Sequence, residues 1–243
     1  MCLLILLHGV DPDYPVLVAN NRDELRSRPT APPGLFVGAQ HRMLSPRDRQ
    51  AQGTWIAVSS LGMFAGLTNI AGEDSRSVQT TRGELPHLAL DQSDLDSAVA
   101  AVVERVAVTE FASFRLLLAD ATGVQLVTHL NGATEISSVT DSVVVLSNEH
   151  GLGQLPIPGI EAVAMPGLDI DQRLESLIPF LLDEGSSSGH RILKRGGDYG
   201  TVASSLIAIP ARPEEGLIWR YAVGEPDRAS YRNYSNLRRR LLP

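Results

Sequence analysis

The chain begins with the stretch MCLLILLH (residues 1–8), which places a cysteine directly before five consecutive apolar residues. Every position from Leu3 to Leu7 is apolar, as expected for a strand that is covered on both faces. A strong turn signal follows at Asp11-Pro12-Asp13-Tyr14-Pro15, and residues 16–19 form a second apolar run. The sequence therefore predicts a buried β-hairpin at its N-terminal end.

Cys2 is the only cysteine of the chain. Because its side chain is small, removal of Met1 is expected to expose it as the new N-terminus. The residue would then carry a thiol, with an ordinary pKa of about 8.5, and an α-amino group, with an ordinary pKa of about 7.7–8.0. This amine is a candidate general base for the thiol proton, which is the logic of N-terminal nucleophile (Ntn) hydrolases. The alternative is that Cys2 is only a small hydrophobic residue at the start of a strand.

Bulk properties indicate a globular protein of ordinary composition. Its 243 residues, 43% of them hydrophobic, suit one large domain over residues 1–243. The net charge of −7 argues against broad nucleic-acid binding, which needs a basic surface. A single cysteine excludes an intramolecular disulfide framework and fits a reducing compartment. The first apolar run is too short for a membrane span and lacks a basic flank, so we expect a cytoplasmic protein.

The remaining sequence alternates between helix-like and strand-like segments. Residues 93–107 have helical apolar spacing behind Ser93 and Asp96, which resemble a capping box, and residues 169–184 show a similar spacing. Pro179 is expected to kink this second helix and Gly185 to end it. The composition of residues 20–52 predicts a mostly irregular segment. Further strands are predicted at residues 54–58, 63–67, 113–119, 124–130, 143–147, 203–209 and 217–223.

Hairpin connections dominate this order, which favours antiparallel sheets over a doubly wound sheet. Strands that are apolar on both faces need cover on each side. We therefore expect an α+β fold in which two stacked, mostly antiparallel sheets are flanked by helices.

The first hairpin also predicts which residues lie beside Cys2. If its turn centres near residue 12, antiparallel pairing joins residues whose numbers sum to about 24–26, so that Cys2 lies opposite Arg22 and Asp23. Asp23 could then accept a hydrogen bond from the α-amino group, and the charge of Arg22 would favour the thiolate. The alternative is that residues 20–23 only form a polar turn at the end of a strand.

Short blocks across nearly the whole chain resemble the NRDE family, which is also called the transport and Golgi organisation 2 (TANGO2) family. The blocks occur in the family's order, and their joint match is specific although each is short. They are Met1-Cys2, Ala19-Asn20-Asn21-Arg22-Asp23-Glu24, Arg28-Pro29-Thr30, Arg47-Asp48, Gly53-Thr54-Trp55, Leu67-Thr68-Asn69, Arg82-Gly83-Glu84-Leu85-Pro86, Leu146-Ser147-Asn148 and Tyr199-Gly200-Thr201.

The resemblance implies an Ntn-hydrolase-like αββα sandwich, an architecture shared with acyltransferases and with bile-salt and penicillin V amidases. Carried over by motif, Cys2 would be the nucleophile and Asp23 would orient its amine. Asn69 and Asn148 would be oxyanion or amine-binding partners, since donors matter most where negative charge develops.

Two positions depart from the pattern that the resemblance implies. Amidases of this group carry an arginine three positions before the aspartate, where this chain has Asn20. The family's usual arginine after Tyr-Gly-Thr is replaced by Val202, which removes a positive charge expected near the thiol.

We expect five side chains to bind substrate, namely Asn20, Asn21, Arg22, Trp55 and Arg82. Trp55 is alternatively a core side chain, and Arg82 with Glu84 alternatively a local polar cluster or a solvated loop. No metal-binding spacing occurs, so no metal site is predicted.

Two accounts of function follow from these residues. In the first, the protein is a Cys2-dependent amidohydrolase or acyltransferase that needs no cofactor and acts on a small acyl amide or thioester. The arginines of residues 22–49 would then hold an anionic end of the substrate. In the second, the protein is a non-catalytic carrier of haem or acyl-CoA, a role suggested by the family's eukaryotic members. A third possibility is an interaction protein with no small ligand.

Overall fold

The computed structural model describes residues 2–72, 80–187, 189–212 and 215–241. Their contacts divide the chain into two compact units, of which the first comprises residues 1–28 and 141–236 and the second residues 29–140 and 237–243. Each unit is built on one seven-stranded sheet, and every strand pairing is antiparallel. The predicted α+β class, with two antiparallel sheets flanked by helices, is confirmed. That residues 1–243 form a single domain stays a prediction.

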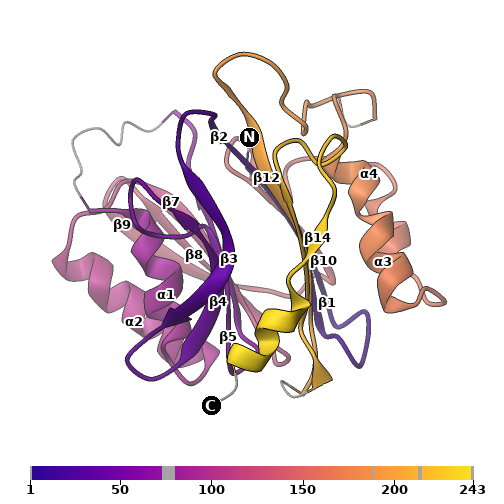
Figure 1. Ribbon diagram of the computed structural model, residues 1–243. Coiled ribbons are helices and arrows are strands. Elements are labelled where there is room, and N and C mark those ends of the chain that lie inside the picture. The colour runs from indigo at the N-terminus through magenta and orange to yellow at the C-terminus, as the bar shows by residue number, and fades with distance from the viewer. Residues whose placement is uncertain (1, 73–79, 188, 213–214, 242–243) are drawn as a thin grey trace. The chain divides into compact units, whose positions relative to one another are not determined.

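The sheet of the first unit has the strand order β11-β10-β1-β2-β12-β13-β14. Helices α3 and α4 pack on it (Figure 1), and their leucines share a core with the alternate residues Leu3, Ile5 and Leu7 of β1. The strands are β1 (Leu3–His8), β2 (Val16–Leu25), β10 (Val143–Ser147), β11 (Gly151–Leu152), β12 (Tyr199–Ile209), β13 (Ile218–Val223) and β14 (Arg232–Asn233). The helices are η2 (Ile160–Ala164), α3 (Ile170–Ser176) and α4 (Ile178–Leu181), and η4 (Ser235–Arg240) begins in this unit and ends in the second.

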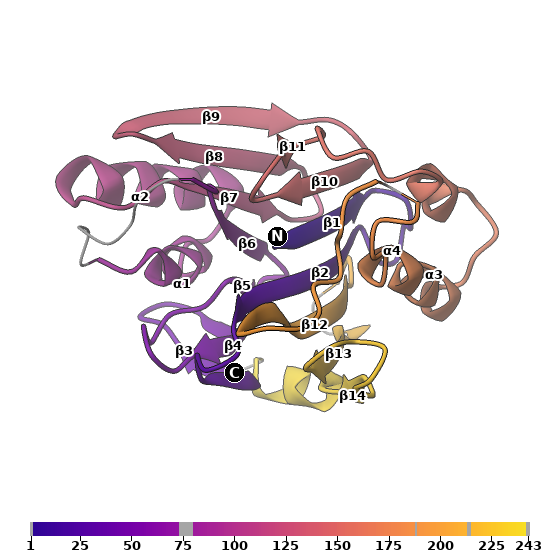
Figure 2. The same cartoon turned by 90° about the horizontal axis from the view of Figure 1, so that it is seen from above.

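The sheet of the second unit runs in chain order from β3 to β9. Helices α1 and α2 lie beside it (Figure 2), with Leu85, Ala98 and Val102 in a core shared with Leu116 and Val127 of the sheet. The strands are β3 (Thr30–Val37), β4 (Arg42–Asp48), β5 (Ile56–Ser59), β6 (Phe64–Asn69), β7 (Phe114–Ala119), β8 (Val124–Leu130) and β9 (Ala133–Val139). The helices are η1 (Arg82–Glu84), α1 (Leu85–Leu90) and α2 (Leu95–Val108).

The prediction that residues 20–52 are mostly irregular is wrong. They contain the end of β2 and the strands β3 and β4. Pro32 and Pro33 suggested a loop, but β3 is the edge strand of its sheet and its pairing register shifts between Ala31 and Gly34. Proline is tolerated at such an edge or bulge because no ladder hydrogen bond is lost there.

The predicted second helix is broken in two. Helix α3 ends at Ser176 and the short α4 begins at Ile178, with Pro179 in its first turn. Proline interrupts the helical hydrogen bonds, so the break falls where the sequence placed a kink. The helix predicted at residues 93–107 is α2, but Asp94, rather than Ser93, caps it by accepting a hydrogen bond from the Ser97 N–H at 2.8 Å.

Candidate active site

Cys2 precedes β1, which lies between β10 and β2 in the middle of the first sheet. Leu3 pairs with Asn21 on one side and with Ser147 on the other, so the paired residue numbers of β1 and β2 sum to 24, within the predicted range. The Cys2 carbonyl accepts a hydrogen bond from the Asn148 N–H at 3.3 Å, and the Cys2 Sγ donates to the Asp23 carbonyl at 3.5 Å. Neighbouring strands therefore hold Cys2 from both sides.

Asp23 presents a buried carboxyl group next to this cysteine. Its side chain is 3% exposed, and the Thr201 hydroxyl donates to its Oδ1 at 2.7 Å. The two residues face each other in the pairing of β12 with β2. Burial raises the pKa of Asp23 above its ordinary value, and the Thr201 hydrogen bond opposes that rise. Thr201 therefore favours the ionised form of Asp23.

The thiol of Cys2 is protonated at neutral pH in this environment. Burial and, to a smaller extent, the negative charge of Asp23 raise its pKa to about 11. Arg22 acts in the predicted direction by lowering the thiol pKa, but burial outweighs it. The Arg22 guanidinium is itself buried and lies 3.6 Å from a Glu24 carboxylate oxygen. A reaction at Cys2 consequently needs a base close enough to accept the thiol proton directly.

Asn148 follows β10 and carries a buried amide group. Its backbone is tied to Cys2, while its side-chain oxygen is buried and has no hydrogen-bond partner in the described part of the chain. Buried polar atoms nearly always have a partner, so this unsatisfied amide oxygen calls for a hydrogen-bond donor from a ligand or water.

The other two asparagines of this region make contacts within the fold. Asn20 donates its side-chain amide to the Leu3 carbonyl at 2.8 Å, and Asn21 donates to the Leu181 carbonyl at 2.8 Å. These contacts attach β2 to β1 and to the end of α4. That Asn20 and Asn21 also contact substrate stays a prediction.

Asn69, Trp55 and Arg82 belong to the second unit, so their part in the site stays a prediction. Asn69 ends β6, and Trp55 is buried just before β5, as expected for a core side chain. Arg82 donates to the Ser113 carbonyl at 2.8 Å. The Glu84 carboxylate accepts from Arg105 at 2.8 Å.

Three residues beside Asp23 and Asn148 were not singled out as site residues from the sequence. Tyr199 donates its hydroxyl to the Asp23 carbonyl at 3.0 Å. Lys194 forms an ion pair of 2.8 Å with Glu149, and its ammonium lies 5.9 Å from the Tyr199 ring centroid. Tyr199 lies in the motif Tyr199-Gly200-Thr201 and Glu149 directly follows the motif Leu146-Ser147-Asn148, whereas no motif signalled Lys194.

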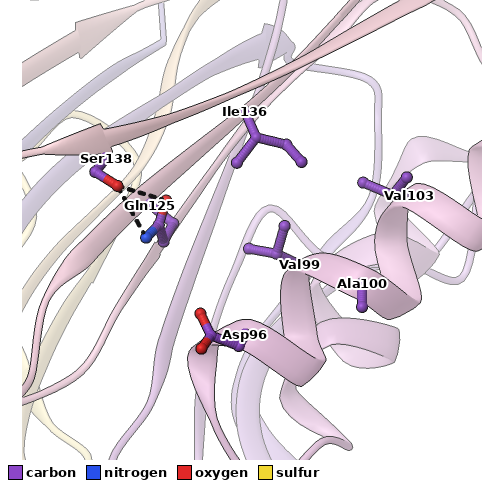
Figure 3. Close-up of a pocket in the computed structure, with 7 residues that line it drawn as sticks. All are labelled: Asp96, Val99, Ala100, Val103, Gln125, Ile136 and Ser138. Atoms are coloured by element: carbon purple, nitrogen blue, oxygen red, sulfur yellow. Dashed lines mark hydrogen bonds between the residues drawn. The ribbon is translucent and has the colours of Figure 1, made fainter.

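A pocket of about 440 Å³ lies in the second unit, between α2 and the hairpin of β8 and β9 (Figure 3). Val99, Val103 and Ile136 supply apolar surface, and Gln125 and Ser138 are hydrogen-bonded to each other. Asp96 is its one titratable lining residue, and none of the predicted site residues contributes to it. The pocket therefore has no nucleophile with an adjacent base.

The described residues show neither a metal-binding cluster nor a membrane-spanning helix. They contain no cluster of three His, Cys, Asp or Glu side chains arranged to hold a metal ion. None of the helices in the described ranges is long and apolar enough to cross a membrane.

The fold is that of Ntn-type hydrolases. The C2A mutant of the conjugated bile acid hydrolase from Clostridium perfringens matches with a TM-score of 0.59 and 11% identity, over 97% of this chain and 93% of that one. The N-acylethanolamine-hydrolyzing acid amidase orthologue of Caenorhabditis elegans matches with a TM-score of 0.60 and 10% identity, over 88% and 94%.

The family is settled by sequence. The family model described as "Transport and Golgi organisation 2" (TANGO2) matches residues 1–165, and the chain belongs to this family. No curated protein matches the chain at a significant level of sequence similarity.

Proposed function

We propose that this protein is a Cys2-dependent Ntn amidohydrolase or acyltransferase that acts on a small acyl amide or thioester. The observation that carries the proposal is the position of Cys2, whose thiol donates to the backbone of Asp23 and whose carbonyl is bonded to Asn148. A nucleophile, a buried carboxylate and an open amide thus lie together at the end of β1. The structural neighbour that is named as an N-acylethanolamine-hydrolyzing acid amidase supports an acyl amide as the substrate class.

In the proposed reaction, Met1 is removed first and the α-amino group of Cys2 accepts the thiol proton. The Sγ atom then bonds to the substrate carbonyl carbon, and the carbonyl electron pair moves to oxygen. Asn69 and Asn148 are the proposed donors to this oxyanion. When the tetrahedral intermediate collapses, the C–N bond breaks and the α-ammonium group returns its proton to the leaving amine. The acyl group is left on Cys2 as a thioester.

The second half of the reaction repeats these roles. Water, or an amine in the case of an acyltransferase, attacks the thioester while the α-amino group accepts its proton. The C–S bond breaks and the thiol is restored. Ionised Asp23 stabilises the α-ammonium group that forms in each half, which is why the Thr201 hydrogen bond to its carboxylate matters.

The anionic end of a substrate is proposed to meet basic side chains. Of the arginines suggested by the sequence, Arg26 is paired with Glu225 at 2.8 Å, while Arg22 and Arg28 both lie within 4 Å of Glu24. We expect these reactions in the cytoplasm, and we place the substrate among small acyl compounds.

The test begins with the intact mass of the purified protein before and after a brief iodoacetamide pulse at neutral pH. We expect loss of Met1 and fast alkylation at one site, followed by turnover in a panel of N-acyl amides. Cys2→Ala should abolish turnover, whereas the matched surface variant Ser187→Ala should keep it. Retained Met1 with an inert thiol would contradict the proposal, and haem and acyl-CoA titrations would then test the carrier account.

A further inference from the structure

Lys194 is the only lysine among 243 residues, and arginine supplies the other twenty of the 21 basic side chains. It lies between α4 and β12, in the segment that leads into the proposed site. Its N–H donates to the Thr201 hydroxyl at 3.1 Å, and its carbonyl accepts from the Thr201 N–H at 3.0 Å. The backbone of Lys194 is therefore attached to the residue that holds Asp23.

The side chain of Lys194 reaches the opposite side of the same site. Its Nζ lies 2.8 Å from Oε1 of Glu149, which directly follows Asn148. Asn148 in turn donates its N–H to the Cys2 carbonyl. With the Thr201–Asp23 and Cys2–Asp23 contacts, this closes a ring of contacts, which we call the Cys2 ring. Its members are Cys2, Asp23, Asn148, Glu149, Lys194 and Thr201.

The strand order shows what the ion pair connects. Strand β10 leads to Glu149 and β12 contains Thr201, and the strands β1 and β2 lie between them. Neighbouring strands are about 4.7–4.9 Å apart, so three steps across the sheet span about 14 Å. The Lys194–Glu149 pair bridges this span at the ends of β1 and β2 that bear Cys2 and Asp23.

The charge of Lys194 acts on Asp23. Burial raises the pKa of Asp23, whereas the ammonium of Lys194 is one of the groups that lower it. Burial lowers the pKa of Lys194 itself, but its hydrogen bond to Glu149 and the charge of Asp23 raise it above its ordinary value, so the ammonium persists at neutral pH. Other charged or titratable groups of this region include Arg22 and Glu24 on β2, Tyr199 on β12, His150 after β10, His190 before Lys194, and the chain's α-amino group, which also lowers the pKa of Asp23.

We propose that Lys194 and Glu149 are a positioning pair for the Cys2 site: the ion pair holds the turn after β10 and the start of β12 around Cys2, and brings a positive charge within range of Asp23. We class both as positioning residues because the contacts that join them to Cys2 run through Asn148, Thr201 and Asp23. The proposal deepens the proposed function and rests on it, because an ionised Asp23 serves catalysis by holding the α-ammonium group of Cys2.

The test is the pH dependence of Cys2 alkylation by iodoacetamide in the wild type, Lys194→Met and Lys194→Arg. Alkylation of the wild type should slow as the pH falls, because protonated Asp23 no longer stabilises the α-ammonium group that forms when the thiol gives up its proton. Loss of a nearby positive charge raises a carboxyl pKa, so Lys194→Met should move this acid limb to higher pH by about one unit. Lys194→Arg should leave it near the wild-type position.

Two controls separate this role from general loss of structure. Arg220 lies on β13, forms an ion pair with Asp171 and is about as exposed as Lys194. Arg220→Met removes this cation and should leave the acid limb unchanged. Adding Glu149→Gln to Lys194→Met should move the limb no further, because the pair acts as one unit.

Titration of the Asp23 carboxyl by carbon-13 NMR measures the same shift without any reaction at Cys2. It therefore decides this proposal even if Met1 is retained and the proposed function fails. Identical Asp23 titration in the wild type and Lys194→Met, or an arginine variant as shifted as the methionine variant, would overturn the proposal.

Discussion

At the scale of single residues, the main feature of the candidate site is the buried carboxyl group of Asp23. Asp23 is almost fully buried, which favours its neutral form, and Thr201 opposes this with a 2.7 Å hydrogen bond. Thr201 is itself fully buried and also accepts the N–H of Lys194. Its hydroxyl therefore forms hydrogen bonds with two partners, Asp23 and Lys194, in a position that bulk water does not reach.

Replacing Thr201 by Val should lower the free energy of unfolding at pH 7 by about 2 kcal/mol, because the buried carboxylate of Asp23 loses a hydrogen-bond donor. The pKa of folded Asp23 is already raised, so its ionisation destabilises the fold above the ordinary carboxyl pKa. Thr201→Val raises the pKa of Asp23 further. The loss of unfolding free energy in the variant should therefore shrink as the pH falls through the folded-state pKa of Asp23. Urea unfolding at pH 7 and near pH 4 measures this change.

Thr201→Ser is the matched control, because it keeps the hydroxyl and removes only a methyl group. It should lose less stability than Thr201→Val, with little dependence on pH. A deficit of Thr201→Val that is equal at both pH values would show that Asp23 is not the group affected.

At the scale of elements, one carboxylate joins a helix end to a turn in the second unit. Asp91 follows α1 and accepts the backbone N–H groups of Ala39, Gln40 and His41 at 2.8–2.9 Å, in the turn between β3 and β4. A Cβ atom at Gly38 would collide with this carboxylate, so glycine is required there. Burial raises the pKa of Asp91, but the three hydrogen bonds lower it more.

We expect Asp91→Ala to lower the free energy of unfolding at pH 7 by about 1 kcal/mol, a value reduced for solvent exposure. Because the folded-state pKa is lowered, the stabilisation by Asp91 is complete above the ordinary carboxyl pKa and is lost as the pH falls through the lowered value. Chemical denaturation between pH 7 and pH 3 should show the two proteins converging. The exposed Asp96→Ala in the next helix is the control, and an equal loss there would contradict this role of Asp91.

At the scale of the whole molecule, the two sheets differ in how far along the chain their strands find partners. In the second unit, each strand pairs with the next one in sequence. In the first unit, Leu3 pairs with Ser147, and Asn21 pairs with Ser204. Closing such long loops costs more conformational entropy, and pairings between distant segments generally form slowly.

Pulsed hydrogen exchange during refolding should therefore protect amides of β5 to β8 before those of β1, β2 and β12. Leu116→Ala in the core of the second unit and Leu174→Ala in the core of the first should each lower the free energy of unfolding by about 2–5 kcal/mol. These variants identify which protected amides belong to which unit. Simultaneous protection of both sheets, or earlier protection of β1, would contradict the expected order.

The placement of Cys2 in the candidate site could be predicted because it depends on one local hairpin. A turn centred near residue 12 was enough to place Cys2 beside Arg22 and Asp23, and the pairing of Leu3 with Asn21 confirms it. Lys194 and Glu149 could not be found in this way. They are 45 residues apart in sequence, and neither stands in a patterned segment.

The sequence by itself determined the antiparallel α+β class, the first hairpin and the family, because alternation, turn residues and short motifs are local. Tertiary structure alone decided that Pro32 and Pro33 lie in an edge strand, that Thr201 holds Asp23, and that the surroundings of Cys2 raise the pKa of its thiol. Burial and electrostatic environment depend on which distant strands become neighbours, and no local pattern encodes that choice.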